Sequence, residues 1–190
     1  MDFWVKSVKI VSMDQQMLWE IYKKVFWSVF LNVNVFTFGC IYLFSFWINL
    51  WGFQFMIWKM VLDLVMMLLL TDVFVYGFHR LMHHRLLYGW SHKMHHELKV
   101  PIGLGALYNH WFDYIFATFA PTLLPAIVMS AHPYTVMLWT IITLTNAIII
   151  SHGSYAFDER LHFYHHQKFV YNYGIGIFMD KLFKTEYKEN

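Results

Sequence analysis

The stretch from Ile57 to His84, IWKMVLDLVMMLLLTDVFVYGFHRLMHH, decides the fold that this sequence predicts. Residues 64–71, at its middle, carry no charge, and three histidines gather at its carboxyl end. A helix needs about 20 predominantly apolar residues to cross a bilayer. The stretch therefore predicts a transmembrane helix that ends in a cluster of histidines.

The composition of the whole chain fits a membrane protein and excludes an ordinary water-soluble enzyme. Of its 190 residues, 58% are hydrophobic and 14% are charged, whereas a soluble domain has about 25% charged residues. The 12 histidines equal the Asp and Glu residues in number, which neither packing nor solubility requires. The net charge of +2 is too small to indicate a nucleic-acid partner. The single cysteine, Cys40, excludes a disulfide framework and a cysteine-based metal site.

Four stretches have the length of a membrane span, and we expect them to form two helical hairpins. They are residues 25–58, which leave room for one span and a turn, and residues 57–78, 114–131 and 133–151. Pro121 and Pro125 should kink the third span, which is tolerated where neighbouring helices or water satisfy the freed carbonyls. The predicted fold is an all-α integral membrane protein.

The basic residues predict an orientation. With four spans, thirteen of the 14 Lys and Arg residues fall on one side of the membrane, and only Lys59 lies in a connection on the other side. The positive-inside rule makes the first side cytoplasmic. The histidine clusters share this side, so we expect a histidine-rich helical cap at the cytoplasmic ends of the spans.

The first 24 residues are predicted to lie at the membrane surface. They contain Asp2, Asp14 and Glu20 and lack a central apolar run, which excludes a signal peptide. Met13 to Lys24 is typical of a short amphipathic helix in the interface. We therefore divide the chain into an interfacial segment, 1–24, and a single membrane domain, 25–190.

The histidines fall in three tight clusters whose spacing is that of a metal site. Residues at i, i+3 and i+4 share a helix face, so each His-x-x-His-His is expected to point its three imidazoles at one point. His79 and His83 obey the i, i+4 rule, whereas His84 needs a distorted helix end, and the choice between His83 and His84 stays open. The predicted topology returns His152 and the third cluster beside the first two. The ten candidate ligands are His79, His83, His84, His92, His95, His96, His152, His162, His165 and His166.

Ten imidazoles exceed the needs of one metal ion. About four to six ligands satisfy one ion, so these histidines predict two ions, and imidazole favours Fe, Cu, Zn or Ni over Mg or Ca. A metal transporter should place its ligands at mid-membrane, and a bis-His haem protein needs paired histidines on facing spans. A zinc-dependent membrane hydrolase accepts the same ligands and is the strongest rival. His132, on the far side, is interpreted as an interfacial residue.

The residues around the clusters resemble the fatty acid hydroxylase/sterol desaturase superfamily over residues 72–185. The likeness rests on the segments 72–84, 92–96 and 162–166, followed by Asn172-Tyr173-Gly174 and residues 180–185. Segments 92–97, 101–103 and 108–113 look most like C4-methylsterol oxidases, and Asn172-Tyr173-Gly174 is also similar to sterol C5-desaturases. The chain departs from the methylsterol oxidase pattern at His152-Gly153-Ser154-Tyr155, where that group has His-Ser-Gly-Tyr, and at Asp113, where it often has Glu.

The resemblance implies a membrane-bound non-haem diiron oxygenase. Such an enzyme uses O2 to hydroxylate a lipid C–H bond, here at the C4-methyl group of a sterol, or to desaturate a sterol or fatty acyl chain on the same site. The implied partners are a lipid that enters from the bilayer and a cytochrome b5 or ferredoxin-type electron donor. The implied cofactor is two iron ions, which zinc can replace in a purified protein. The implied location is the endoplasmic reticulum, or the cytoplasmic membrane in a bacterium.

Six further residues are candidates for a place around the ligands or at the substrate entrance. Asp72 lies about two turns before His79 and should accept a hydrogen bond from a ligand imidazole. A charged residue inside a span is costly, which indicates a function. For His110 and Asp113, where the third span begins, a place near the metals and a simple role in starting the helix both stay open. The six are Asp72, Tyr76, His110, Asp113, Asn172 and Asp180.

Overall fold

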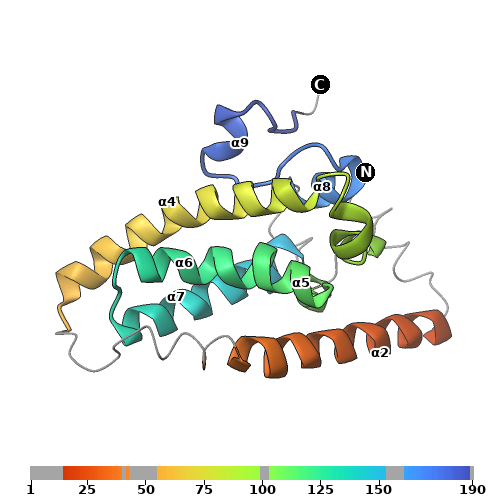
Figure 1. The fold of residues 1–190 in the computed structure, drawn as a ribbon, viewed down its shortest axis with the longest axis horizontal. Helices are drawn as coiled ribbons and strands as arrows, with labels where there is room; N and C mark the ends of the chain where they lie inside the picture. The colour runs from red at the N-terminus through yellow and green to blue at the C-terminus, as the bar shows by residue number, and fades with distance from the viewer. Residues whose placement is uncertain (1–14, 40–41, 43–54, 99–102, 153–160, 189–190) are drawn as a thin grey trace.

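The computed structural model of the protein describes residues 15–39, 42, 55–98, 103–152 and 161–188, and the elements in these ranges are all helical (Figure 1). The α-helices are α2 (Gln15–Leu31), α4 (Ile57–Met82), α5 (Trp111–Asp113), α6 (Ala120–Val128), α7 (Pro133–Thr145), α8 (Leu161–Lys168) and α9 (Met179–Leu182). The π segments are η1 (Asn32–Thr37), η2 (Tyr88–His92), η5 (Tyr114–Phe119) and η6 (Asn146–Ser151), and the 3₁₀ segments are η3 (His95–Glu97) and η4 (Gly103–Leu107). The predicted all-α fold is confirmed.

Three helical stretches are long and apolar enough to cross a membrane: Ile57–Met82, Trp111–Val128 and Pro133–Ser151. They correspond to the second, third and fourth predicted spans. The first predicted span, 25–58, falls in part on residues 40–41 and 43–54, outside the described residues. Three of the four predicted spans are therefore found among the residues that the structure describes.

The predicted boundary between residues 24 and 25 falls inside one helix. Helix α2 begins at Gln15 and continues without a break into η1, so the expected interfacial helix that ends at Lys24 is not a separate element. The physical reason is that no Pro or Gly interrupts residues 15–37, and a started helix extends at little cost until something stops it. Residues 1–14 of the predicted interfacial segment lie outside the described residues.

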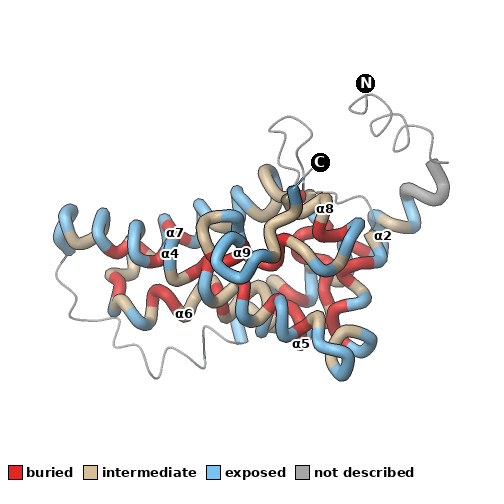
Figure 2. The backbone as a smooth tube through the Cα atoms, turned by 90° about the horizontal axis from the view of Figure 1, so that it is seen from above, coloured by how far each residue is buried: buried red, intermediate tan, exposed pale blue. Residues whose placement is uncertain are grey.

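The spans pack around small apolar clusters. Met67 of α4 meets Ala126 of α6 and Trp139 of α7, and Trp139 Nε1 donates a hydrogen bond of 3.2 Å to the carbonyl oxygen of Thr122. The small side chain of Ala126 lets the helices approach closely, as is common in membranes. Figure 2 shows that the buried residues follow the inner faces of these helices and gather toward the end near α8, while the outer faces are exposed.

The distortion predicted for the third span takes the form of a π segment. Helix α5 runs into η5 immediately before Pro121, and α6 carries Pro125 inside it. Proline cannot donate to the carbonyl four residues earlier, and a wider turn accommodates that loss. The hydroxyl of Thr122 donates to the carbonyl oxygen of Thr118 at 2.8 Å, which satisfies another backbone acceptor of this stretch.

An ion pair with a buried carboxylate lies on α4 at the end opposite α8. Asp63 of α4 is 1% exposed and pairs with Lys59 at 2.6 Å. Lys59 Nζ also donates to the carbonyl oxygen of Met129, just after α6, at 3.3 Å. His132 lies at this end too, and its Nδ1 accepts the backbone N–H of Tyr134 at 3.2 Å, so the ring caps α7.

Candidate metal centre

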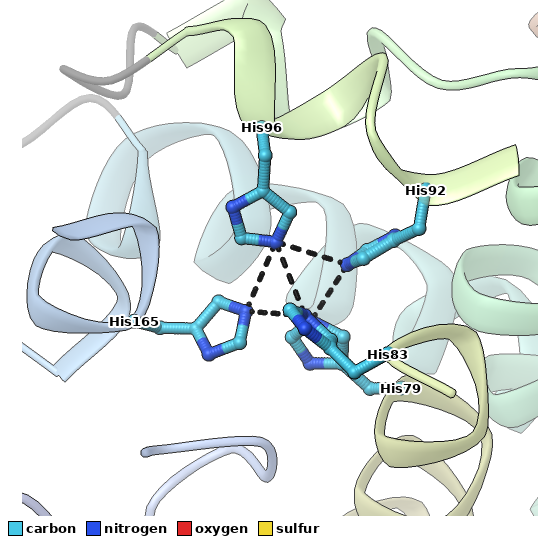
Figure 3. A group of neighbouring side chains, drawn as sticks. All are labelled: His79, His83, His92, His96 and His165. Atoms are coloured by element: carbon cyan, nitrogen blue, oxygen red, sulfur yellow. Dashed lines mark hydrogen bonds between the residues drawn. The ribbon is translucent and has the colours of Figure 1, made fainter. Parts of the chain in front are cut away.

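Nine of the ten candidate histidines converge in two adjoining groups. The five-histidine group, shown in Figure 3, consists of His79, His83, His92, His96 and His165, and the four-histidine group consists of His95, His152, His162 and His166. Within each group, the possible ligand atoms all lie within 4.8 Å of one another. The rings of His96 and His166, from different groups, have centroids 4.6 Å apart. The two groups therefore share a border.

Each His-x-x-His-His cluster contributes to both groups, so the expectation that its three imidazoles point at one point is wrong. His92 and His96 belong to the five-histidine group, whereas His95 belongs to the other. The third cluster divides in the opposite sense, because His165 alone joins the five-histidine group. In α8, successive residues are rotated by about 100°, so the side chains of His162 and His166 nearly align while that of His165 turns aside. One short motif thus serves two neighbouring positions.

The end of α4 separates His83 from His84. The backbone N–H of His83 still donates to the carbonyl oxygen of His79 at 3.1 Å, so the side chains of His79 and His83 stay on one face. Helix α4 ends at Met82 with His83 as its C-cap, and the next residue, His84, is exposed, with its Nδ1 accepting the backbone N–H of Leu86 at 3.4 Å. His84 lies outside both groups, and of the two residues left open by the sequence it is His83 that faces the other histidines.

Backbone carbonyls orient two imidazoles of the five-histidine group. His79 Nδ1 donates to the carbonyl oxygen of Tyr173 at 2.8 Å, and His165 Nδ1 donates to that of Tyr171 at 2.6 Å. A carbonyl can only accept, so the proton lies on Nδ1 and the Nε2 atom of the neutral ring keeps its lone pair. Both Nε2 atoms face the centre of the group (Figure 3). Sequence reasoning missed both carbonyls, because a backbone acceptor has no signature in the residue type.

A carboxylate orients a third imidazole. His92 Nδ1 lies 2.9 Å from each oxygen of Asp113, which is fully buried. A carboxylate behind a metal-binding histidine holds the ring in place and makes it a stronger donor. His110, the companion candidate, instead caps α5 by accepting the backbone N–H of Phe112 at 3.4 Å. Of the two roles left open for this pair, Asp113 thus has the place beside the histidines and His110 has the role in starting the helix.

The spacing of the Nε2 atoms in the five-histidine group fits a shared cation. Neighbouring Nε2 atoms, joined by dashed lines in Figure 3, are 3.0–3.2 Å apart. Two nitrogens at right angles around one ion, each about 2.1 Å from it, would be about 3.0 Å apart. Burial, followed by repulsion from neighbouring imidazoles, lowers the pKa of His83, His96 and His165. The rings are thus held neutral, which is the form that binds a metal.

In the four-histidine group too, an imidazole Nε2 atom has a lone pair that accepts no hydrogen bond from the described residues. His152 Nδ1 donates to the carbonyl oxygen of Ala147 at 2.9 Å, and its buried Nε2 has no hydrogen-bond partner among the described residues. The Nε2 atom of His166 lies 3.2 Å from that of His95 and 2.9 Å from that of His162. Burial lowers the pKa of His152 to about 4 and that of His166 to about 2. A cation fits this set as it fits the first.

Two buried carboxylates hold the loop that presents the Tyr173 carbonyl. Asp72 accepts three backbone N–H groups at 2.8–2.9 Å, from Ile175, Phe178 and Met179. Asp180 accepts those of Tyr173 at 2.9 Å and Gly174 at 2.7 Å. The structure therefore places Asp72 one step further from the histidine groups than predicted, since it holds the loop that carries a backbone acceptor of His79 and does not bond to an imidazole itself. We call this pair of carboxylates the loop cradle.

Asn172 and Tyr76 support the same loop without touching a ligand. Asn172 has a left-handed backbone with φ 55°, and its side-chain oxygen accepts the N–H of Tyr187 at 2.9 Å. The Tyr76 ring stacks on Phe183 with centroids 5.1 Å apart and meets the Tyr173 ring edge-on at 6.0 Å. Tyr76 thus holds the carboxyl-terminal segment against α4, and Asn172 joins two parts of that segment.

Glu97 ties the second cluster to α2, which no feature of the sequence predicted. Its carboxylate accepts Lys24 Nζ at 2.5 Å and the hydroxyl of Tyr108 at 2.9 Å. Nearby, the buried Asn32 donates to the carbonyl oxygens of Leu107 at 3.1 Å and Asn109 at 2.9 Å. These polar contacts fix the first described helix beside the histidine groups.

Gly174 should not tolerate a side chain. A Cβ atom there would lie 2.7 Å from Asp72 Oδ1 and 3.0 Å from Asp180 Oδ2. Gly174→Ala is expected to cost about 1–3 kcal/mol by displacing the loop cradle, and to lower the melting temperature in detergent. The matched control is Gly77→Ala, because a Cβ at Gly77 meets nothing within 4 Å. Equal melting temperatures for the two variants would contradict this account of the cradle.

Comparison with known proteins adds a family and several relatives. A family model described as fatty acid hydroxylase matches residues 64–185, which include every residue of both histidine groups. Fatty acid hydroxylase domain-containing protein 2 of Homo sapiens is 33% identical over 130 residues, covering 66% of this chain and 39% of the relative. Methylsterol monooxygenase erg25B of Aspergillus fumigatus is 28% identical over 148 residues, covering 69% of this chain and 50% of the relative.

C-4 methylsterol oxidase erg25 of Schizosaccharomyces pombe is 29% identical over 145 residues, covering 67% of this chain and 48% of the relative. The chain thus spans half or less of the length of these three relatives. No solved structure matches it.

Proposed function

Because the chain belongs to the fatty acid hydroxylase family, we propose that it is a membrane-bound oxidoreductase that hydroxylates a lipid C–H bond with O2 at a diiron centre. The observation that carries the proposal is the convergence of nine imidazoles in two adjoining groups. Neutral nitrogen ligands suit iron and leave the charge of the ions uncancelled. A pair of bound irons would supply the activation of O2 and the removal of hydrogen from an unactivated carbon.

The proposed substrate is a sterol, oxidised at its C4-methyl group. Two of the relatives described above are named for methylsterol oxidation, which supports this class. The histidine groups lie at the ends of α4 and of the helix formed by α7 and η6, so a lipid could reach them from the bilayer without crossing water. Surrounding apolar helices would exclude bulk water from the reacting carbon. Desaturation of the same lipid is the alternative outcome. The segment Asn172-Tyr173-Gly174, which is similar to sterol C5-desaturases, contacts His79 through the Tyr173 carbonyl.

The electrons are proposed to come from a cytochrome b5 or ferredoxin-type protein on the cytoplasmic side. Several basic residues near the histidine groups are exposed, and positive charge at this end of the spans supports a cytoplasmic orientation. They are Arg85, Lys93, Lys168 and Lys181. The endoplasmic reticulum is the proposed membrane, since the reaction acts on a membrane sterol.

Metal analysis of protein purified from iron-supplied cells tests the centre. The expected result is two irons per chain and consumption of O2 when the protein is reduced. Stoichiometric zinc, with no O2 consumption after iron has been supplied and the protein reduced, would contradict the oxygenase and favour a zinc-dependent hydrolase.

Lipid analysis of a host that expresses the chain tests the reaction. A hydroxylated sterol should accumulate with the unaltered chain and not with His95→Ala, which removes one ligand of the four-histidine group. A new double bond instead would identify a desaturase. Unchanged lipids, in cells whose protein carries two irons and receives electrons, would contradict lipid oxidation.

A further inference from the structure

The two histidine groups differ in what stands behind their rings. In the five-histidine group, three Nδ1 atoms are held, those of His79 and His165 by carbonyls and that of His92 by a carboxylate, while the buried Nδ1 of His96 has no hydrogen bond among the described residues. In the four-histidine group, the described residues provide His152 with the Ala147 carbonyl, and they leave the buried Nδ1 of His95 without a hydrogen bond. The three held rings of the first group are therefore oriented before any ion binds.

Among the described residues, the carboxylate also adds a difference of charge between the groups. Asp113 is 0% exposed, and among the described residues its salt-bridge geometry is with His92 alone. A buried carboxylate without a cation is costly, so its environment favours positive charge close by. The nearest place where a cation fits is the Nε2 side of the His92 ring, inside the five-histidine group. An ion there would relieve the cost of burying Asp113, and an ion in the other group would do so less, because it binds no ring that Asp113 touches.

We propose that the two metal positions hold their ions unequally, and that Asp113 makes the five-histidine position the one that fills first and empties last. Asp113 acts through His92 and is a positioning residue. The proposal rests on the metal centre assigned above, but it does not depend on the substrate, the electron donor or turnover.

Timed removal of Co²⁺ from the full chain in detergent tests the inequality. The protein is loaded with Co²⁺ alone and treated with EDTA, and the ions that remain bound are counted over time. Two phases are expected, with one ion released at least about tenfold more slowly, the lower end of the effect of partners behind the ligands. The adjacent variants His95→Ala and His96→Ala assign the phases. His95→Ala should keep the slow ion, and His96→Ala should lose it.

The role of Asp113 is tested by Asp113→Asn, which keeps the size and one acceptor oxygen but removes the charge. Release of the slow ion should become about 10–100-fold faster, with the fast ion unchanged. The visible bands of the slow Co²⁺ should also shift, since its ligand His92 becomes a weaker donor, and a purely structural role would not produce that change. Asp113→Glu, which restores the charge, should release the slow ion more slowly than Asp113→Asn does.

Asp63→Asn is the matched control, because Asp63 is a carboxylate buried equally deeply at the other end of α4. Both ions should be retained as in the unaltered chain. A single release phase, a slow ion that survives in His96→Ala but not in His95→Ala, or equal acceleration of both ions by Asp113→Asn would each overturn the proposal. Binding of fewer than two Co²⁺ per unaltered chain would instead overturn the two-metal centre on which it rests.

Discussion

Asp72→Ala is expected to unfold the segment behind the metal centre, although Asp72 touches no ligand. The substitution strips three backbone N–H groups, the buried one of Met179 and the partly buried ones of Ile175 and Phe178, of their acceptor. Leaving the buried N–H of Met179 unsatisfied costs about 1–3 kcal/mol by itself, against a typical total of about 5–15 kcal/mol, and the two partly buried groups add to the loss. The Tyr173 carbonyl moves with this loop, so His79 also loses its orientation.

The measurement is the melting temperature in detergent, together with the metal content after iron loading. Thr71→Val is the matched control, because the neighbouring Thr71 hydroxyl is buried and has no hydrogen-bond partner among the described residues. Removing that hydroxyl should leave stability unchanged or raise it. Asp72→Asn, which keeps one acceptor oxygen, should fall between the two. If Asp72→Ala melted at the temperature of Thr71→Val, the loop cradle would not have the role assigned to it.

His83→Ala and His84→Ala should differ sharply although the residues are adjacent. His83 Nε2 lies 3.0 Å from that of His165 and 3.1 Å from that of His96, whereas His84 is exposed. Loss of even an outer partner of a metal ligand costs about 10–100-fold, so His83→Ala should lower product formation at least about 100-fold and release the ion of its group. His84→Ala should stay within about twofold, the usual effect of a surface substitution.

Product in the expressing host and metal per purified chain measure this contrast. The control is built into the pair, since both variants remove one imidazole from neighbouring positions. If His84→Ala were inactive and had lost metal while His83→Ala stayed active, His84 rather than His83 would be the metal ligand, and this prediction would be wrong.

The spans could be predicted from the sequence because a bilayer leaves the backbone few choices. Without water to satisfy N–H and C=O groups, an apolar stretch such as 57–82 must be helical. The predicted end of the interfacial helix at Lys24 is wrong, because α2 continues through Lys23 and Lys24 to Leu31. Charged side chains change where a helix prefers to lie, but they do not stop it, as a Pro or Gly would.

The candidate ligands could also be predicted, but their division into groups could not. Spacing identifies which residues share a helix face only within a regular helix, and the clusters lie in π, 3₁₀ and α segments. His165 joins His79 and His83 only because α8 is folded back against the end of α4 (Figure 1). That return depends on packing between segments more than 80 residues apart along the chain.

The sequence alone predicts an all-helical membrane fold and a set of histidines large enough for two ions. It also carries a family resemblance, which the family model confirms. Only the tertiary structure decided that His83 rather than His84 faces the other ligands, that Asp113 stands behind His92, and that Asp72 acts through a loop. The reason is that a side chain's type shows what it can bind, whereas its partners here are distant carboxylates and backbone carbonyls. Every residue carries the same carbonyl, so only the folded chain determines which ones meet an imidazole.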